Sequence, residues 1–295
     1  MTNFDIIFRI FSIVERYALY QLFCYNNNEF IKMVIKMKIA LAQLDIKWED
    51  KNFNIIKCEK FIKEASYKGC SIIIFPEMTL TGFSMNTSII GEDIDGFTVT
   101  CFKKFAKENK IAVCFGYVKN NNRKALNEMI IVDKNGLVVS KYDKIHPFSY
   151  GEESKYYEGG KSISTCNIDE FNIGSFICYD LRFPEVFQAS SKINEIIFLI
   201  ANWPKERIEA FNILLRARAI ENQCYIAAVN RVGESDGLNY NGYSQVVDPL
   251  GNVLISENKC EKLIMCDILK EKVFNIRKKF SLKEDRREEI YKEFY

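Results

Sequence analysis

From Met37 onward the chain alternates short apolar segments with longer amphipathic ones. Residues 37–46 (MKIALAQLDI) and 70–77 (CSIIIFPE) predict strands, and residues 52–66 between them predict a helix. Four residues of this helix share one face: Ile55, Cys58, Ile62 and Ala65. We expect that face to pack against a sheet, because a helix with one apolar stripe buries it. The order strand, helix, strand is typical of an α/β fold.

The same alternation continues to the end of the chain, with antiparallel pairs mixed in. Asn135-Gly136, between two apolar runs, predicts a two-residue hairpin turn, and Pro-Leu-Gly at 249–251 predicts a last hairpin. The remaining predicted elements are strands at 111–118, 171–178, 195–203 and 225–232 and helices at 99–109, 184–192 and 207–223. Because no linker or repeat interrupts residues 37–295, we expect one domain there, preceded by an N-terminal extension at 1–36 whose order the sequence leaves open.

Charge and cysteine content narrow the possible partners. The 41 basic and 39 acidic residues leave a net charge of +2 and form no stripe, so we expect no nucleic-acid partner. The apolar spacing in residues 1–36 is interrupted by charges, so we expect neither a membrane span nor a signal peptide. Ten cysteines stand singly at apolar positions, which favours reduced thiols in the cytoplasm. With His146 as the single histidine and no Cys-x-x-Cys pair, we expect no metal.

Three predicted strands end in residues that can carry chemistry. They deliver Glu77, Lys144 and Cys178. In α/β enzymes a rigid sheet fixes such residues while the following loop exposes them. Each also has a structural explanation, because a carboxylate after a strand can cap a turn, a lysine can be a solvated surface charge, and a buried cysteine behaves as a small hydrophobe.

The setting of Cys178 favours a nucleophile. Gly174 permits close backbone approach, the predicted strand ends at Cys178, and Pro184 begins a helix after a polar turn. Such a strand-turn-helix elbow presents a side chain to a cleft, and the amide N–H after it can stabilise an oxyanion. The partner of the thiol stays open at this point, since Lys144 and His146 are two residues apart and can face the same side of an extended segment.

The segments around these residues resemble those of the nitrilase superfamily, the carbon-nitrogen hydrolases. Glu77 in FPEMTLTGF, Lys144 in KYDKIHPF and Cys178 in CYDLRFPE stand in the order of that superfamily's Glu-Lys-Cys triad. The resemblance runs from MKIALAQLDI to DRREEIY and is greatest to the omega-amidase branch, which hydrolyses 2-oxoglutaramate and similar omega-amides of dicarboxylic acids. It implies a four-layer α-β-β-α sandwich with mixed sheets, a homodimer, and no cofactor.

The resemblance also implies a role for each residue of the triad. Glu77 would be the general base, Cys178 the attacking thiolate, and Lys144 the cation that stabilises the oxyanion together with the N–H of Tyr179. Because a free thiol has a pKa of about 8.5, an adjacent base and a lysine are sensible means of forming and holding the anion. Expulsion of ammonia would leave a thioester on Cys178, which water then hydrolyses.

Further residues are carried over from the family pattern. Its second active-site glutamate is best matched by Glu153, with Glu152 as the alternative. Trp203 would line the pocket, although ordinary packing explains it equally well. Arg182 would receive a substrate carboxylate or make a structural salt bridge. A cluster on one predicted helix favours an ion-pair network over a site: Arg216, Arg218 and Glu221.

The expected function is therefore hydrolysis of a small linear amide. Two alternatives share the fold. An N-carbamoyl amide hydrolase uses the same triad and releases carbon dioxide as well as ammonia, and an inactive binding scaffold keeps the fold without turnover.

Overall fold

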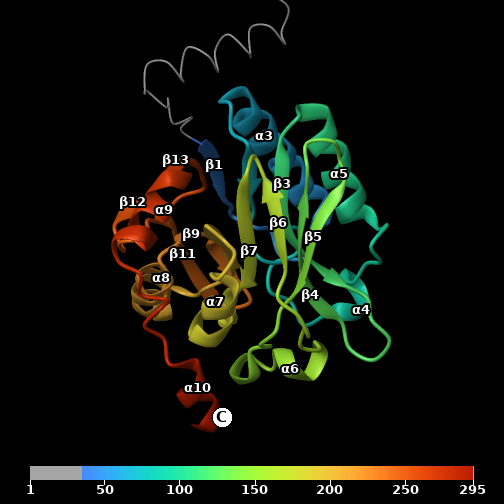
Figure 1. The fold of residues 1–295 in the computed structure, drawn as a ribbon. Coiled ribbons are helices and arrows are strands. Elements are labelled where there is room, and N and C mark those ends of the chain that lie inside the picture. Colours follow the sequence, from blue (N-terminus) through green and yellow to red (C-terminus); the bar gives the residue numbers. More distant parts are fainter. Residues whose placement is uncertain (1–34, 295) are drawn as a thin grey trace, which may run out of the picture. The chain divides into compact units, whose positions relative to one another are not determined.

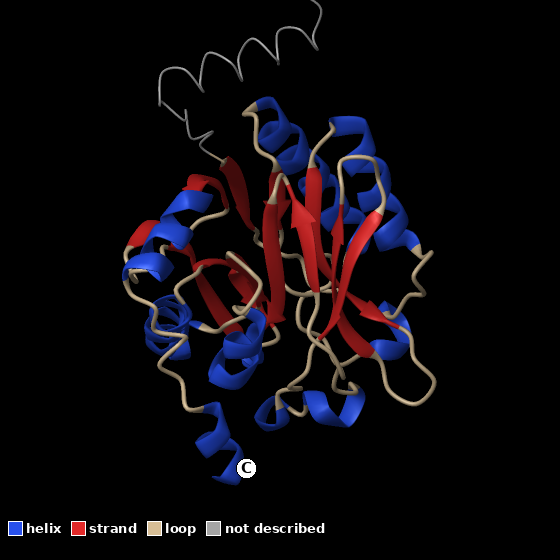
Figure 2. Ribbon diagram, viewed as in Figure 1, coloured by secondary structure: helices blue, strands red, loops and turns tan. Residues whose placement is uncertain are grey.

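The computed structural model describes residues 35–294, shown in Figures 1 and 2. The chain divides into two units, Met1–Ile35 and Lys36–Tyr295, of which the second is compact. The N-terminal extension predicted at 1–36 thus lies almost wholly outside the described residues, and everything below concerns the second unit.

Two mixed sheets form the centre of this unit (Figure 2). The first has the strand order β13-β1-β2-β3-β4-β5, with β1, β2 and β3 parallel and the other pairs antiparallel. Its strands are β1 (Lys36–Gln43), β2 (Ile72–Ile74), β3 (Ala112–Lys119), β4 (Leu126–Val132), β5 (Val138–Asp143) and β13 (Lys262–Leu269).

The second sheet has the order β10-β11-β9-β8-β7-β6, with β12 paired to β11. Here β7, β8 and β9 are parallel, and the remaining pairs are antiparallel. Its strands are β6 (Thr165–Ile168), β7 (Phe171–Ile177), β8 (Ile196–Ala201), β9 (Tyr225–Asn230), β10 (Val232–Ser235), β11 (Leu238–Val247) and β12 (Val253–Asn258).

Helices cover the outer faces of both sheets (Figure 1). The first sheet carries α3 (Lys51–Tyr67) and α5 (Phe97–Asn109), and the second carries α7 (Pro184–Ser190) and α8 (Ile208–Asn222). Strand β1 also contacts β9, and β4 contacts β7, so the sheets pack face to face. This is the predicted four-layer α-β-β-α sandwich. The shorter or peripheral helices are α4 (Thr87–Ile90), α6 (Glu153–Tyr156), α9 (Lys270–Lys279) and α10 (Glu288–Tyr291), with 3-10 turns at Ser149–Gly151, Cys178–Arg182, Lys205–Arg207 and Lys292–Phe294.

Successive side chains of the central strands point to opposite faces of the sheet, and both faces are buried, so these strands are continuous apolar runs in the sequence. Ala40, Ile73 and Val113 belong to one core cluster together with the buried face of α3, which confirms the predicted packing of that helix. Their neighbours Ile39 and Ile72 are equally buried and point to the opposite side, toward the second sheet. Both faces of these strands are therefore covered, as is usual for parallel strands.

The β4–β5 hairpin differs from its prediction in one detail. Asn135 and Gly136 do lie in its turn, but Asp133 N–H donates to the Leu137 carbonyl, so three residues form the loop. The Asp133 carboxylate accepts from the backbone N–H groups of Asn135 and Leu137, and Gly136 has a φ of +81°. The prediction of a two-residue turn was therefore wrong, because the aspartate side chain stabilises the longer loop.

No helix of residues 35–294 is both long and apolar enough to cross a membrane.

Candidate active site

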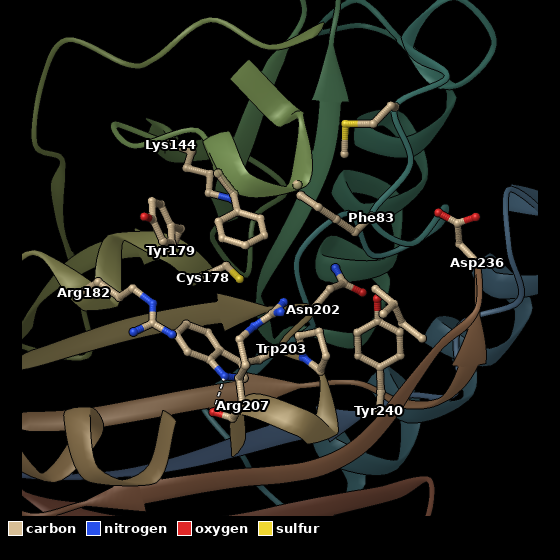
Figure 3. Close-up of a pocket in the computed structure, with 15 residues that line it drawn as sticks. Phe83, Lys144, Cys178, Tyr179, Arg182, Asn202, Trp203, Arg207, Asp236 and Tyr240 are labelled. Atoms are coloured by element: carbon tan, nitrogen blue, oxygen red, sulfur yellow. Dashed lines mark hydrogen bonds between the residues drawn. The ribbon is translucent and has the colours of Figure 1, made fainter. Parts of the chain in front are cut away.

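The strand ends of both sheets meet at one cavity of about 230 Å³ (Figure 3). Lys144 follows β5, Cys178 follows β7, and Asn202 and Trp203 follow β8, and all four line the cavity. Glu77 lies three residues beyond β2 and is fully buried behind them. The sandwich thus brings together the three strand-end residues that the sequence singled out.

Cys178 stands on a strained elbow. Strand β7 ends at Ile177, Cys178 itself has a φ of +46°, and α7 begins at Pro184. A positive φ is unfavourable for a residue with a side chain, so the surroundings must hold it. The buried Asp180 carboxylate does so by accepting the Ile177 N–H at 3.0 Å and the Tyr142 hydroxyl at 2.8 Å. The predicted strand-turn-helix elbow is confirmed.

Lys144 lies between two buried carboxylates. Its Nζ is 2.9 Å from Glu77 Oε1 and 2.8 Å from Glu153 Oε2. The Asn127 side-chain amide donates to the same two glutamates, at 2.7 and 3.0 Å. The backbone N–H of Asn202 donates to the other Glu77 oxygen at 2.9 Å. These contacts fix the Glu77 carboxylate from three sides.

Burial and charge shift the pKa values of this cluster. Burial would lower the pKa of Lys144, but the charges of Glu153 and Glu77 more than offset it and raise that pKa well above its ordinary value. Burial raises the pKa of the Cys178 thiol, Glu77 raises it further, and Lys144 opposes both. Burial likewise raises the pKa of Glu153, against the effect of Lys144. The lysine is therefore an ammonium, and the resting cysteine is a protonated thiol.

The two candidate glutamates have different environments. Glu153 is fully buried, and one of its oxygens also accepts the Phe148 N–H at 2.6 Å. Glu152 is exposed, has a φ of +62° and pairs with Lys155 on the surface. The structure thus places Glu153 beside the lysine and Glu152 away from it.

His146 faces the elbow and not the cavity. Its Nδ1 lies 2.7 Å from Asp180 Oδ1, and its ring stacks on Phe183 with 3.8 Å between centroids. It is not among the described residues that line the cavity. The geometry therefore gives Cys178 no imidazole partner and favours the glutamate and lysine over a Cys-His pair.

The predicted binding residues Tyr179, Arg182 and Trp203 all line the cavity. The Arg182 guanidinium lies 5.0 Å from the Trp203 ring centroid. Trp203 Nε1 donates to the Arg207 carbonyl at 2.8 Å. Trp203 therefore does both things considered for it, lining the pocket and packing at the strand end.

The ion-pair network expected on α8 is only partly correct. Arg218 pairs with Glu221 at 3.0 Å and also donates to the Leu181 carbonyl. Arg216 donates instead to the Gly251 carbonyl, so including it in the network was wrong. The two arginines extend from the helix toward different partners.

Several cavity residues escaped the sequence analysis: Phe83, Phe148, Asn202, Arg207, Asp236, Leu238 and Tyr240. The last three come from the β10–β11 hairpin, whose turn residues Asp236 and Gly237 have φ values of +49° and +71°. An Asp-Gly pair between two strands is a hairpin signal that would have located this segment, but not its place at the cavity. Among residues 35–294 no group of three or more His, Cys, Asp or Glu side chains is arranged to hold a metal ion.

In this four-layer sandwich the Cys178 elbow lines the same cavity as Lys144, whose ammonium contacts two buried glutamates. Residues 38–278 match the family model of the carbon-nitrogen hydrolases. The chain belongs to this family, part of the nitrilase superfamily, and is an enzyme that acts on carbon-nitrogen bonds of amides.

Individual relatives agree with the family assignment. The chain is 32% identical over 260 residues to 2-oxoglutaramate amidase of Bacillus subtilis (strain 168), a match that covers 87% of this chain and 100% of that protein. It is 30% identical over 222 residues to omega-amidase YafV of Escherichia coli (strain K12), covering 74% and 84%. The structure of XC1258 from Xanthomonas campestris, a CN-hydrolase superfamily protein with an arsenic adduct in the active site, matches with a TM-score of 0.81 at 29% identity, covering 85% and 97%.

Proposed function

We propose that this protein is a thiol-dependent amidohydrolase that cleaves a small omega-amide of a dicarboxylic acid, such as 2-oxoglutaramate, and releases ammonia through a thioester on Cys178. The observation that carries this proposal is the Glu77-Lys144-Glu153 cluster next to a thiol on an elbow. The substrate class is supported by the relatives named 2-oxoglutaramate amidase and omega-amidase.

The protonated resting thiol defines the first step. Since the pKa of Cys178 is raised, Glu77 takes the thiol proton as the sulfur attacks the amide carbon. The carbonyl oxygen becomes an oxyanion, which the Lys144 ammonium and the Tyr179 N–H stabilise. Glu77 then gives its proton to the leaving nitrogen, and ammonia departs as the thioester forms.

The second half of the reaction regenerates the thiol. Glu77 removes a proton from a water molecule, which attacks the thioester carbonyl. The acid leaves, and Cys178 regains the proton from Glu77. Glu153 holds Lys144 in position throughout, through contacts of 2.8 and 3.1 Å to its ammonium.

The cavity suits a short substrate with a distant negative charge. Its volume of about 230 Å³ fits a small linear amide. Trp203 supplies an apolar wall, and Arg182 receives the carboxylate at the far end of the substrate. We further propose that residues 37–295 form the catalytic domain and that the protein is a cytoplasmic homodimer without a cofactor.

Ammonia release tests the assignment. Purified protein should release ammonia from 2-oxoglutaramate, succinamate and glutaramate, and Cys178→Ala should abolish the release. Absence of ammonia from all three would reject the omega-amidase assignment. Carbon dioxide formed together with ammonia from N-carbamoyl substrates would favour the carbamoyl hydrolase instead.

Two variants test the partner of the thiol. We expect Lys144→Ala to abolish turnover, because it removes the cation beside the oxyanion and leaves two buried glutamates unpaired. If His146→Ala abolished turnover while Lys144→Ala left it intact, a Cys-His mechanism would replace the proposed one.

Labelling tests the inactive scaffold. A thiol reagent should modify Cys178 faster than the exposed Cys260, because Glu77 can take the Cys178 proton during attack, and it should not reach Cys58 and Cys114, which are buried in the core. Mass spectrometry of the labelled peptides reads this out. A binding protein without a reactive site should show no such selectivity.

A further inference from the structure

Two arginines share one wall of the cavity. Arg182 ends the 3-10 turn that begins at Cys178, and Arg207 ends the 3-10 turn directly before α8. Both line the cavity with Cys178. In Figure 3 the Trp203 indole lies between the side chains of Arg182 and Arg207. These two turns follow neighbouring parallel strands, β7 and β8, which is why residues 25 positions apart in sequence meet at one wall.

Aromatic rings support both guanidinium groups. The Arg182 group lies 5.0 Å from the Trp203 ring centroid, and the Arg207 group lies 5.3 Å from that of Phe148. The hydrogen bond from Trp203 Nε1 to the Arg207 carbonyl holds the indole against the turn that ends at Arg207. A guanidinium that rests on an aromatic ring keeps its N–H edge free for hydrogen bonds. The rings therefore position both arginines and leave their N–H groups able to bind a ligand.

The basic side chains at the cavity differ in whether a carboxylate of the protein neutralises them. Lys144 is neutralised by Glu77 and Glu153. Neither Arg182 nor Arg207 forms an ion pair with any carboxylate of residues 35–294. Asp236, which also lines the cavity, lies on the β10–β11 hairpin, apart from both arginines in Figure 3. Arg182 is exposed and Arg207 is half-buried. Two cations at one cavity without an acid partner can bind an anion supplied by the ligand.

We propose that Arg182 and Arg207 form a two-arginine site for the substrate carboxylate, and that Arg207 determines the preference of the enzyme for anionic over neutral amides. This inference rests on the proposed amidase function and names the residue that gives it specificity. A carboxylate has two oxygens, so it can take one hydrogen-bonded guanidinium edge on each.

The test compares two substrates of the same shape. Glutaramate and glutaramide differ only in that a carboxamide replaces the carboxylate at the far end. We expect Arg207→Gln to lower kcat/KM for glutaramate about 30-fold, in the range of a lost charge-assisted hydrogen bond, and that for glutaramide less than about 3-fold. The loss should appear mainly in KM, because the carboxylate is bound equally in the ground and transition states.

Lys205→Gln is the matched control. Lys205 is an exposed cation on the same 3-10 turn and does not line the cavity. Its replacement should leave the rates for both substrates unchanged. Arg182→Gln should show the same substrate-dependent loss as Arg207→Gln, and labelling of Cys178 by iodoacetamide in each variant checks that the site is folded.

The outcomes separate this inference from the function on which it rests. Equal losses for glutaramate and glutaramide, or no loss for either, in a variant that is labelled like the wild type would overturn the two-arginine site and leave the amidase intact. A wild-type enzyme that releases no ammonia from any of these amides would overturn both.

Discussion

The elbow that carries Cys178 depends on one buried carboxylate, and Asp180→Asn tests this dependence. Asp180 Oδ1 accepts from the His146 N–H at 3.0 Å and faces the His146 Nδ1 at 2.7 Å. Its Oδ2 accepts from the Ile177 N–H at 3.0 Å and the Tyr142 hydroxyl at 2.8 Å. The substitution keeps the shape of the side chain but replaces one oxygen by an amino group, which cannot accept a hydrogen bond.

Either orientation of the new amide leaves a backbone donor without a partner. If the amino group takes the Oδ2 position, the Tyr142 hydroxyl can rotate to accept, but the Ile177 N–H cannot. If it takes the Oδ1 position, the imidazole can change tautomer, but the His146 N–H cannot adapt. An unpaired buried donor costs about 1–3 kcal/mol, and the remaining bonds lose their charge assistance, so we expect a loss of about 3 kcal/mol.

The assay is thermal unfolding combined with ammonia release. For a domain of this size a loss of about 3 kcal/mol lowers Tm by about 6–12 °C. Because the elbow sets the position of the nucleophile, kcat should also fall, by about 10- to 100-fold. Tyr142→Phe is the control, since it removes one hydroxyl near the carboxylate and should cost about 1 kcal/mol. An Asp180→Asn variant no less stable than Tyr142→Phe would refute this account of the elbow.

Three further changes have directions that the structure fixes. Glu153→Gln should lower the rate of ammonia release at least about 100-fold, because the buried lysine loses a charged partner, whereas Glu152→Gln on the exposed turn should leave that rate unchanged. Burial raises the pKa of Asp143 to about 6, above its value in the unfolded chain. The stability that the protonated carboxyl contributes is therefore present below about pH 4 and is lost as the pH rises through about 6. Asp143→Asn should raise Tm at pH 8 and change it little at pH 4. Gly174→Ala would place a Cβ 2.3 Å from Ser190 Oγ and should destabilise the protein by about 1–3 kcal/mol, measured by urea unfolding.

The sequence predicted the elements and the strand-end residues because both depend on local pattern. Apolar runs identified the central strands, and Glu77, Lys144 and Cys178 could be grouped because each follows the end of one. The pattern did not show that these ends belong to two facing sheets. The four layers were implied only by the family resemblance, and the strand order was not predicted. Periodicity describes which side of an element is buried, but not which element covers it.

The cavity residues that the sequence analysis missed are those whose position depends on how strands pair and where hairpins point. Arg207 was the first residue of the helix predicted at 207–223, and its place at the cavity depends on the parallel pairing of β7 and β8. Asp236 and Tyr240 lie on a hairpin whose turn the sequence can predict, but the sequence does not predict that this hairpin lies at the cavity. The predicted ion pairing of Arg216 was wrong for the opposite reason. Helical spacing allowed a contact with its neighbours on the helix, but the side chain donates to the Gly251 carbonyl instead.

Charge balance explains why the proposed reaction needs both a glutamate and a lysine. With two carboxylates and one ammonium, the resting cluster already has an excess of negative charge, so a free thiolate at Cys178 would be unfavourable, consistent with its raised pKa. Transfer of the thiol proton to Glu77 during attack keeps the total charge constant, and it moves the negative charge from that carboxylate to the oxyanion. Lys144 then exchanges one anionic partner for another within the same site, so the net charge of the cluster does not change in this step.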